Sequence, residues 1–168
     1  MPFTPLHLGP GLAFKALGGK RFSFLVFGGA QVMMDIEPLL GLLNDWPVLH
    51  GPTHTLAGAL AIGLLATALG HPVSRAFLRL LSRPFHDLTW GAACAGAFAG
   101  TLSHILFDAV MHSDMHPSWP VAAGNPLLGA IGLGHLHLLC LALGLLGLAI
   151  LGIRQSLSPK KIKHWEKP

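Results

Sequence analysis

Charged residues are scarce in this sequence, since aspartate, glutamate, lysine and arginine together make up 11% of its 168 residues. A soluble globular domain carries about a quarter charged residues. Apolar residues account for 52%, and glycine, which is more frequent in membrane helices than in soluble ones, occurs 21 times. The composition excludes an ordinary water-soluble domain and predicts that much of the surface faces lipid. The length allows one domain.

Several motifs are absent as well. Cys94 and Cys140 both lie in apolar runs and form neither a disulfide framework nor a Cys-x-x-Cys pair, so they are interpreted as small core residues. The sequence lacks a Gly-x-Ser-x-Gly motif and a phosphate-binding glycine loop. It has no basic stripe with interleaved aromatic residues, so the net charge of +4 does not indicate nucleic-acid binding. No basic region precedes the first apolar stretch, which therefore does not resemble a signal peptide.

What is present is a series of apolar segments separated by short polar ones. They cover residues 22–34, 55–70, 88–111 and 126–153, with a shorter stretch at residues 3–17. Glycine and alanine dominate residues 91–100, which suits close contact between helices in lipid. We predict an all-α fold, an integral membrane bundle of four to five helices. Residues 1–153 would form a single transmembrane domain and residues 154–168 a basic cytoplasmic tail.

The charges are distributed unevenly along the chain. All 11 lysines and arginines fall in three places, at residues 15–21, 75–83 and 154–167. An even number of membrane crossings separates these places, so they can share one side, which the positive-inside rule makes cytoplasmic. The other side receives five of the seven acids and several of the histidines: Asp35, Glu37, Asp45, His50, His54, Asp108, His112, Asp114 and His116.

Depth in the membrane sharpens this pattern. At ~1.5 Å of rise per residue, Asp35 and His7 lie roughly 20 Å above the basic side. His104 and Asp108 lie about 25–30 Å above it, near the top of a hydrocarbon core that is ~30 Å thick. We therefore expect six titratable groups to share one layer just below the outer surface: His7, Asp35, His54, His104, Asp108 and His137.

His104 and Asp108 form the best single candidate pair, because residues four apart lie on one helical face. Imidazole and carboxylate are a common ligand pair for zinc and other divalent ions. His112 would continue this face if the helix extends that far. The alternative is a histidine–aspartate hydrogen bond within a helix interface. For His112, Asp114 and His116 we favour a solvated loop over a site at the rim.

Two further segments are candidates. In His50-Gly-Pro-Thr-His54, His54 is expected to lie at the start of a helix and His50 just before it. The two histidines can chelate an ion, and the alternative is a pair of interfacial loop histidines. In Asp35-Ile-Glu37, two acids are expected at the end of a short buried helix, where negative charge is unfavourable unless a cation neutralises it. Glu37 is predicted to be a metal ligand or the general base, and a solvated helix cap is the alternative.

Taken together, these motifs resemble a known family. In order along the chain they are His7-Leu-Gly, Asp35-Ile-Glu37, His50-Gly-Pro-Thr-His54-Thr-Leu, and Ser103-His104-Ile-Leu-Phe-Asp108 followed by a proline-rich loop. Over residues 7–126 the chain resembles the YdjM-like family of bacterial membrane-bound, metal-dependent hydrolases. The resemblance implies an inner-membrane protein with histidine and aspartate metal ligands. The chain departs from the family in lacking an arginine between the two histidines of the third motif, so no arginine contact to an anion is available there.

Three functions compete. The first is a metal-dependent hydrolase of an ester or phosphoester, in which one or two ions, expected to be zinc, activate water and Glu37 is the base. The predicted ligands are His7, Asp35, His50, His54, His104 and Asp108, and a site at the membrane boundary suits an amphiphilic or lipid-like substrate. The second is a non-enzymatic metal-binding membrane protein, and the third a structural one whose polar cluster holds no metal. If His7 belongs to the site, five helices are expected, and otherwise four.

Overall fold

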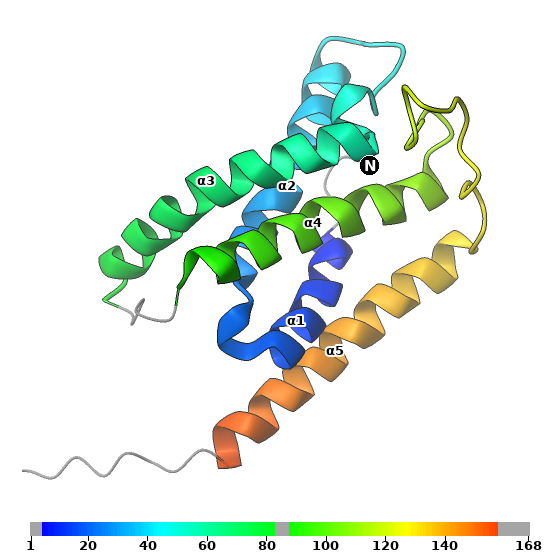
Figure 1. Cartoon of the computed structure of the whole chain (residues 1–168). Coiled ribbons are helices and arrows are strands. Elements are labelled where there is room, and N and C mark those ends of the chain that lie inside the picture. The colour runs from blue at the N-terminus through cyan, green and yellow to red at the C-terminus, as the bar shows by residue number, and fades with distance from the viewer. Residues whose placement is uncertain (1–4, 83–87, 158–168) are drawn as a thin grey trace, which may run out of the picture.

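The computed structural model describes residues 5–82 and 88–157, and within these residues all regular structure is helical. The described part contains five α-helices: α1 (Leu8–Gly18), α2 (Phe24–Leu43), α3 (Leu56–Leu80), α4 (Trp90–Met111) and α5 (Leu133–Leu157). Short 3-10 turns precede three of them: η1 (Pro5–His7), η2 (Gly19–Arg21) and η3 (Pro52–His54). The predicted all-α bundle is thereby confirmed (Figure 1).

Helices α2 to α5 are each long and apolar enough to cross a membrane. Their outer faces are covered with exposed aliphatic side chains, such as Leu64 on α3 and Leu145 on α5, with 65% and 59% of their surface accessible. Such faces are unfavourable in water and suit lipid. In Figure 1 the η2 turn and the last turns of α3 and α5 lie toward the lower left, and the loops that follow α2 and α4 lie toward the upper right. The four helices fit a multi-pass membrane protein.

The glycines and alanines of α4 allow it to approach α2 closely. A Cβ atom on Gly96 would lie 2.3 Å from the carbonyl oxygen of Ser23, and one on Gly100 would lie 2.9 Å from that of Phe27. The backbone N–H of Ser23 also donates to the carbonyl oxygen of Ala92 over 3.0 Å. The expectation of close helix contact at residues 91–100 is confirmed. Because the two helices are in contact, residues at the same height along α2 and α4 lie beside one another.

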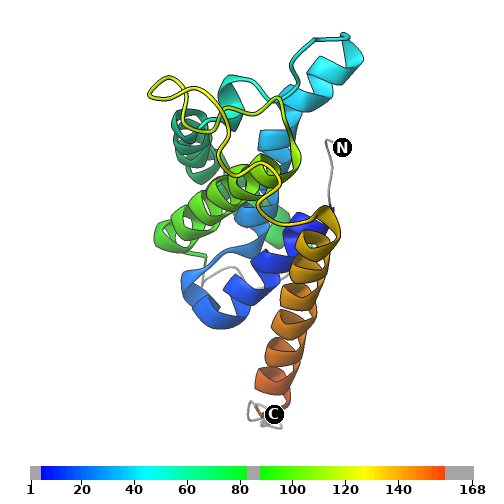
Figure 2. The same cartoon turned by 90° about the vertical axis from the view of Figure 1, so that its right-hand side faces the viewer.

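Helix α1 is shorter, with 11 residues, and packs mainly against α5 (Figure 2). Glycines again form the contact. A Cβ atom on Gly9 would lie 2.1 Å from the carbonyl oxygen of Cys140, and one on Gly147 would lie 2.5 Å from the backbone of Leu12. This packing holds the start of α1, and His7 just before it, against the interior of the bundle, where His7 is 4% exposed.

Two helix boundaries differ from the expectation. Helix α2 does not end near residue 34 but continues through Pro38 to Leu43, so Asp35 lies inside it. Proline is tolerated within membrane helices because neighbouring groups satisfy the backbone that it leaves unpaired. Helix α5 begins at Leu133 rather than near residue 126, because the preceding residues form turns that include Gly129 at a φ of +70°. Within the predicted basic tail, residues 154–157 continue α5, and residues 158–168 lie outside the described part, as do Arg83, His86 and Asp87.

Candidate metal centre

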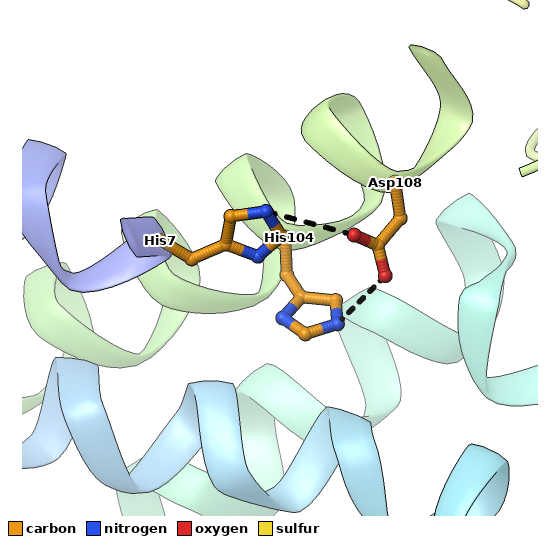
Figure 3. A group of neighbouring side chains, drawn as sticks. All are labelled: His7, His104 and Asp108. Carbon is orange, nitrogen blue, oxygen red and sulfur yellow. Dashed lines mark ion pairs between the residues drawn. The ribbon is translucent and has the colours of Figure 1, made fainter. Parts of the chain in front are cut away.

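The carboxylate of Asp108, near the end of α4, is the centre of a buried polar cluster. Its Oδ1 atom lies 3.7 Å from Nε2 of His7, and its Oδ2 atom lies 3.1 Å from Nε2 of His104 (Figure 3). The same Oδ2 atom lies 3.7 Å from Nε2 of His54 and 4.0 Å from Nε2 of His50. All five side chains are at most 5% exposed. Four imidazoles from three separate parts of the chain thus turn their Nε2 atoms toward one carboxylate.

Hydrogen bonds determine which nitrogen of His104 carries the proton. Ser103 donates its hydroxyl to the carbonyl oxygen of Gly100, so its Oγ atom accepts from Nε2 of Gln31 over 3.3 Å. The Oε1 atom of Gln31 therefore faces Nδ1 of His104, at 2.5 Å, and accepts its proton. The Nε2 atom of His104 is left with a lone pair that points at Asp108.

The neighbourhood of His54 gives the same result. Glu37 accepts hydrogen bonds from the backbone N–H of Thr53, over 3.1 Å, and from the Thr53 hydroxyl. The hydroxyl oxygen is then free to accept from Nδ1 of His54, which lies 3.0 Å away. The Oε2 atom of Glu37 is itself 3.5 Å from this Nδ1. Nε2 of His54 also presents a lone pair to Asp108.

His50 is oriented by the loop that follows α4. Nδ1 of His50 lies 2.9 Å from Oδ1 of Asp114, a carboxylate that also accepts from the backbone N–H groups of Leu49 and His50 over 3.0 and 3.1 Å. Nε2 of His50 is thereby directed at Asp108. The ring of His112 stacks on that of His50, with centroids 4.0 Å apart and an interplanar angle of 27°.

In these arrangements the unprotonated Nε2 atoms of the histidines face the oxygens of Asp108, so hydrogen-bond acceptors lie opposite acceptors. Within the described part of the chain, Nε2 of His7, His54 and His104 are buried without a hydrogen-bond partner. Each faces a carboxylate, and a buried polar atom without a partner costs about 1–3 kcal/mol. A divalent cation between them would satisfy all of these atoms at once. Ligands bound to zinc at about 2.0–2.2 Å lie roughly 3.3–3.6 Å apart, close to the separations seen here.

The donors are of the right chemical kind for such an ion. Neutral imidazole and carboxylate suit zinc, manganese, iron and other divalent metals. Metal-binding histidines usually donate their second N–H to a carboxylate or another acceptor, which orients the ring. Gln31, Thr53 with Glu37, and Asp114 provide such acceptors for the three histidines described above. The residues present therefore fit a divalent metal ion.

Electrostatics outside the membrane-spanning helices agrees with this ligand state. Burial lowers the pKa of His7 to about 4, with the nearby charge of Asp108 opposing the shift. Burial and the neighbouring His50 lower the pKa of His112 as well. Burial raises the pKa of Asp114, but the hydrogen bonds from His50 and Leu49 outweigh it and hold the pKa at about 2. His7 and His112 are therefore neutral and Asp114 is ionised at neutral pH, and these are the forms that bind metal.

Most of the residues predicted from the sequence lie in this cluster. Besides Asp108 and the four histidines around it, Asp35 belongs to the cluster, because its Oδ1 atom is 3.6 Å from Nε2 of His104. The carboxylate of Glu37 contacts Thr53 and lies near Nδ1 of His54, whereas Asp108 faces Nε2, the other nitrogen of that ring. The role of Glu37 as the base stays a prediction.

Other residues were missed or placed differently. His112 and Asp114, expected in a solvated loop, contact His50. Gln31 was not considered, although it lies four residues before Asp35 and thus on the same face of α2. His116 is exposed and accepts from the backbone N–H of Gly124.

On the opposite side of the bundle, Nε2 of His71 lies 3.1 Å from the carbonyl oxygen of Leu88 and its ring stacks on that of Trp90, so this histidine has a structural role.

A small cavity of about 190 Å³ opens beside the cluster. His50 forms part of its wall, and the remaining lining is mostly apolar: Val48, Gly51, Pro52, Thr55, His116 and Trp119. A molecule in this cavity would reach the cluster from the side of the loops that follow α2 and α4. Comparison with known proteins adds nothing to this geometry, since no protein-family model, no curated protein and no solved structure matches the chain.

Proposed function

We propose that this protein is a membrane-embedded, metal-dependent hydrolase that cleaves an ester or phosphoester bond. The observation that carries the proposal is the set of buried imidazole lone pairs around Asp108. His50, His54 and His104 each have their Nδ1 proton bound by another residue and direct Nε2 at the same carboxylate. Without a cation such an arrangement is energetically unfavourable. Ionisable groups within membrane proteins are rare and usually functional.

A divalent ion bound there would supply a Lewis acid and an acidified water. The chain itself contributes the orientation of its ligands and a group that accepts the proton from water. Two carboxylates compete for this second task. Glu37 is the base predicted from the sequence, whereas Asp35 is the carboxylate that lies 3.6 Å from the metal-facing nitrogen of His104. We propose Asp35 as the nearer acceptor, with Glu37 orienting His54 through Thr53.

The cavity beside His50 supports an amphiphilic substrate. Its apolar walls, including Trp119, would contact the aliphatic part of such a molecule next to the metal. The lysines and arginines of the chain all belong to segments at residues 15–21, 75–83 and 154–167, so a phosphate group would depend on metal for its counter-charge. A phospholipid or a polyprenyl phosphate fits both requirements.

The cellular location is part of the proposal. The resemblance of the four motifs to YdjM-like hydrolases supports the bacterial inner membrane. The basic segments support a cytoplasmic C-terminus with the metal centre near the outer face, by the positive-inside rule.

The first experiment is metal analysis of the full chain purified in mild detergent without chelator. We expect near-stoichiometric zinc, manganese or iron by elemental mass spectrometry, and loss of the metal in the His104→Ala, Asp108→Ala double variant. The exposed His116→Ala variant serves as the control and is expected to retain the metal. Hydrolysis of nitrophenyl phosphate, nitrophenyl acetate and phospholipid in mixed micelles is then compared before and after chelation.

Restoration of hydrolysis by added metal would support the proposal. A well-folded, monodisperse wild-type protein that takes up no metal on titration would overturn it and leave a structural histidine cluster. Metal bound at full occupancy without hydrolysis of any of these substrates would instead support a non-enzymatic metal-binding protein.

A further inference from the structure

The cluster contains more donors than one ion uses. Catalytic zinc takes three protein ligands and structural zinc takes four. Here the donors near Asp108 are seven, counting Asp108 itself: His7, Asp35, His50, His54, His104, Asp108 and His112. A single four-coordinate ion would use four of these seven residues and leave three without a metal bond.

The donors fall into two groups that share one residue. His7, His104 and Asp108 offer ligand atoms that all lie within 4.8 Å of one another, and so do His50, Asp108 and His112. Oδ1 of Asp108 lies 3.7 Å from Nε2 of His7, whereas Oδ2 lies 3.1 Å from Nε2 of His104 and 4.0 Å from Nε2 of His50. Because Asp108 belongs to both groups, its carboxylate is placed where it can bridge two ions.

We propose that His50, His112 and Asp108 hold a second divalent cation, and that Asp108 bridges it to the ion held by His7 and His104. This inference rests on the proposed metal centre but adds a second ion to it. His54, which is completely buried and whose Nε2 has no hydrogen-bond partner among the described residues, lies 3.7 Å from the bridging carboxylate and can complete either coordination sphere.

Charge balance is consistent with two ions. Four carboxylates belong to the cluster and its immediate partners: Asp35, Glu37, Asp108 and Asp114. With neutral histidines, one divalent ion leaves two negative charges and two divalent ions leave none. Asp35 and Asp108 are buried, whereas the side chains of Glu37 and Asp114 are 16% and 31% exposed. The second ion thus removes the remaining charge.

The second position is also the one closer to the cavity. His50, one of its proposed ligands, forms part of the wall of the 190 Å³ space that Trp119 and Pro52 line. Two ions about 3.5–4 Å apart are the usual arrangement in enzymes that hydrolyse phosphoesters. A second ion at this position would lie beside a molecule in the cavity and would add positive charge for binding a phosphoester.

The experiment counts ions in the full-length protein. The wild type, the His112→Ala variant and the His7→Ala variant are saturated with Mn²⁺ or Zn²⁺ in detergent, desalted, and measured by elemental mass spectrometry. We expect two ions per chain in the wild type and one in each variant, with His116→Ala retaining two. Circular dichroism and size-exclusion chromatography establish that each variant is folded.

The Mn²⁺-loaded wild type provides a readout that does not depend on any variant. Two Mn²⁺ ions bridged by one carboxylate are expected to give an exchange-coupled electron paramagnetic resonance spectrum, and His112→Ala a spectrum of isolated Mn²⁺. A wild type that binds one ion at saturation, with an uncoupled spectrum, would overturn the second site and leave the proposed single-ion hydrolase standing. A wild type that binds none would overturn both.

Discussion

Nδ1 of His50 lies 2.9 Å from Oδ1 of Asp114, and this contact joins a loop after α4 to a histidine that lies 64 positions earlier in the chain. The carboxylate also accepts the backbone N–H groups of Leu49 and His50. It therefore determines both the position of the His50 backbone and the direction of its ring. An acceptor of this kind behind a metal ligand makes the other ring nitrogen more basic and better aimed.

Replacement of this carboxylate should weaken metal binding. In Asp114→Asn the ring of His50 loses its charged acceptor, and we expect the affinity for Zn²⁺ to fall by about 10–100-fold. Competition with a chromophoric chelator in detergent measures the change. Asp45→Asn is the matched control, because Asp45 is an exposed acid on the preceding loop. Equal affinities in the two variants would show that Asp114 does not orient a ligand.

A second prediction concerns Gln31, whose Oε1 atom accepts the Nδ1 proton of His104. Gln31→Met keeps the side-chain length but removes the acceptor, so His104 loses the hydrogen bond that directs its lone pair at Asp108. We expect Zn²⁺ affinity to fall by about 10-fold or more. Gln31→Glu retains an acceptor and should bind Zn²⁺ more tightly than Gln31→Met. Both affinities are obtained by isothermal titration calorimetry, and the reverse order would contradict the assignment.

Asp35 and Glu37 can be separated by their effects on different quantities. Asp35→Asn removes the proton acceptor nearest to His104, so at saturating metal we expect kcat to fall by about 10²–10⁴-fold. Glu37→Gln disturbs the Thr53 and His54 contacts, so we expect weaker metal binding and a kcat that recovers when more metal is added.

Steady-state hydrolysis over a series of metal concentrations measures both quantities. If instead kcat of Glu37→Gln stays low at every metal concentration while Asp35→Asn is active, Glu37 is the base, as the sequence predicts.

The contact between α2 and α4 should be intolerant of larger side chains. A Cβ on Gly96 would lie 2.3 Å from the backbone oxygen of Ser23, which cannot move without shifting α2. Gly96→Ala is expected to lower the free energy of unfolding by about 1–3 kcal/mol, as overpacking does in other cores. Gly152→Ala, in open space on α5, is the control and should be neutral or slightly stabilising. Thermal unfolding in detergent compares the two, and equal midpoints would contradict a tight helix crossing.

The amino-acid sequence by itself determined the class of the protein and the local part of the site. Low charge and long apolar runs are properties of composition, and they predicted a helical membrane bundle. His104 and Asp108 could be paired because a four-residue spacing fixes their common face in any α-helix. The clustering of basic residues likewise allowed several histidines and acids to be assigned to one level of the membrane before any packing was known.

Tertiary structure determined those members of the cluster that the spacing of residues along the sequence does not predict. His7 belongs to the cluster because glycine contacts hold α1 against α5, and such contacts depend on which helices meet. His112 lies beyond the end of α4, so its stacking on His50 depends on the path of a loop rather than on helical periodicity. The acceptors that orient the histidines, Gln31 and Asp114, lie 73 and 64 positions from their partners. Contacts over such separations arise only when the chain packs, because local geometry fixes direction for a few residues at most.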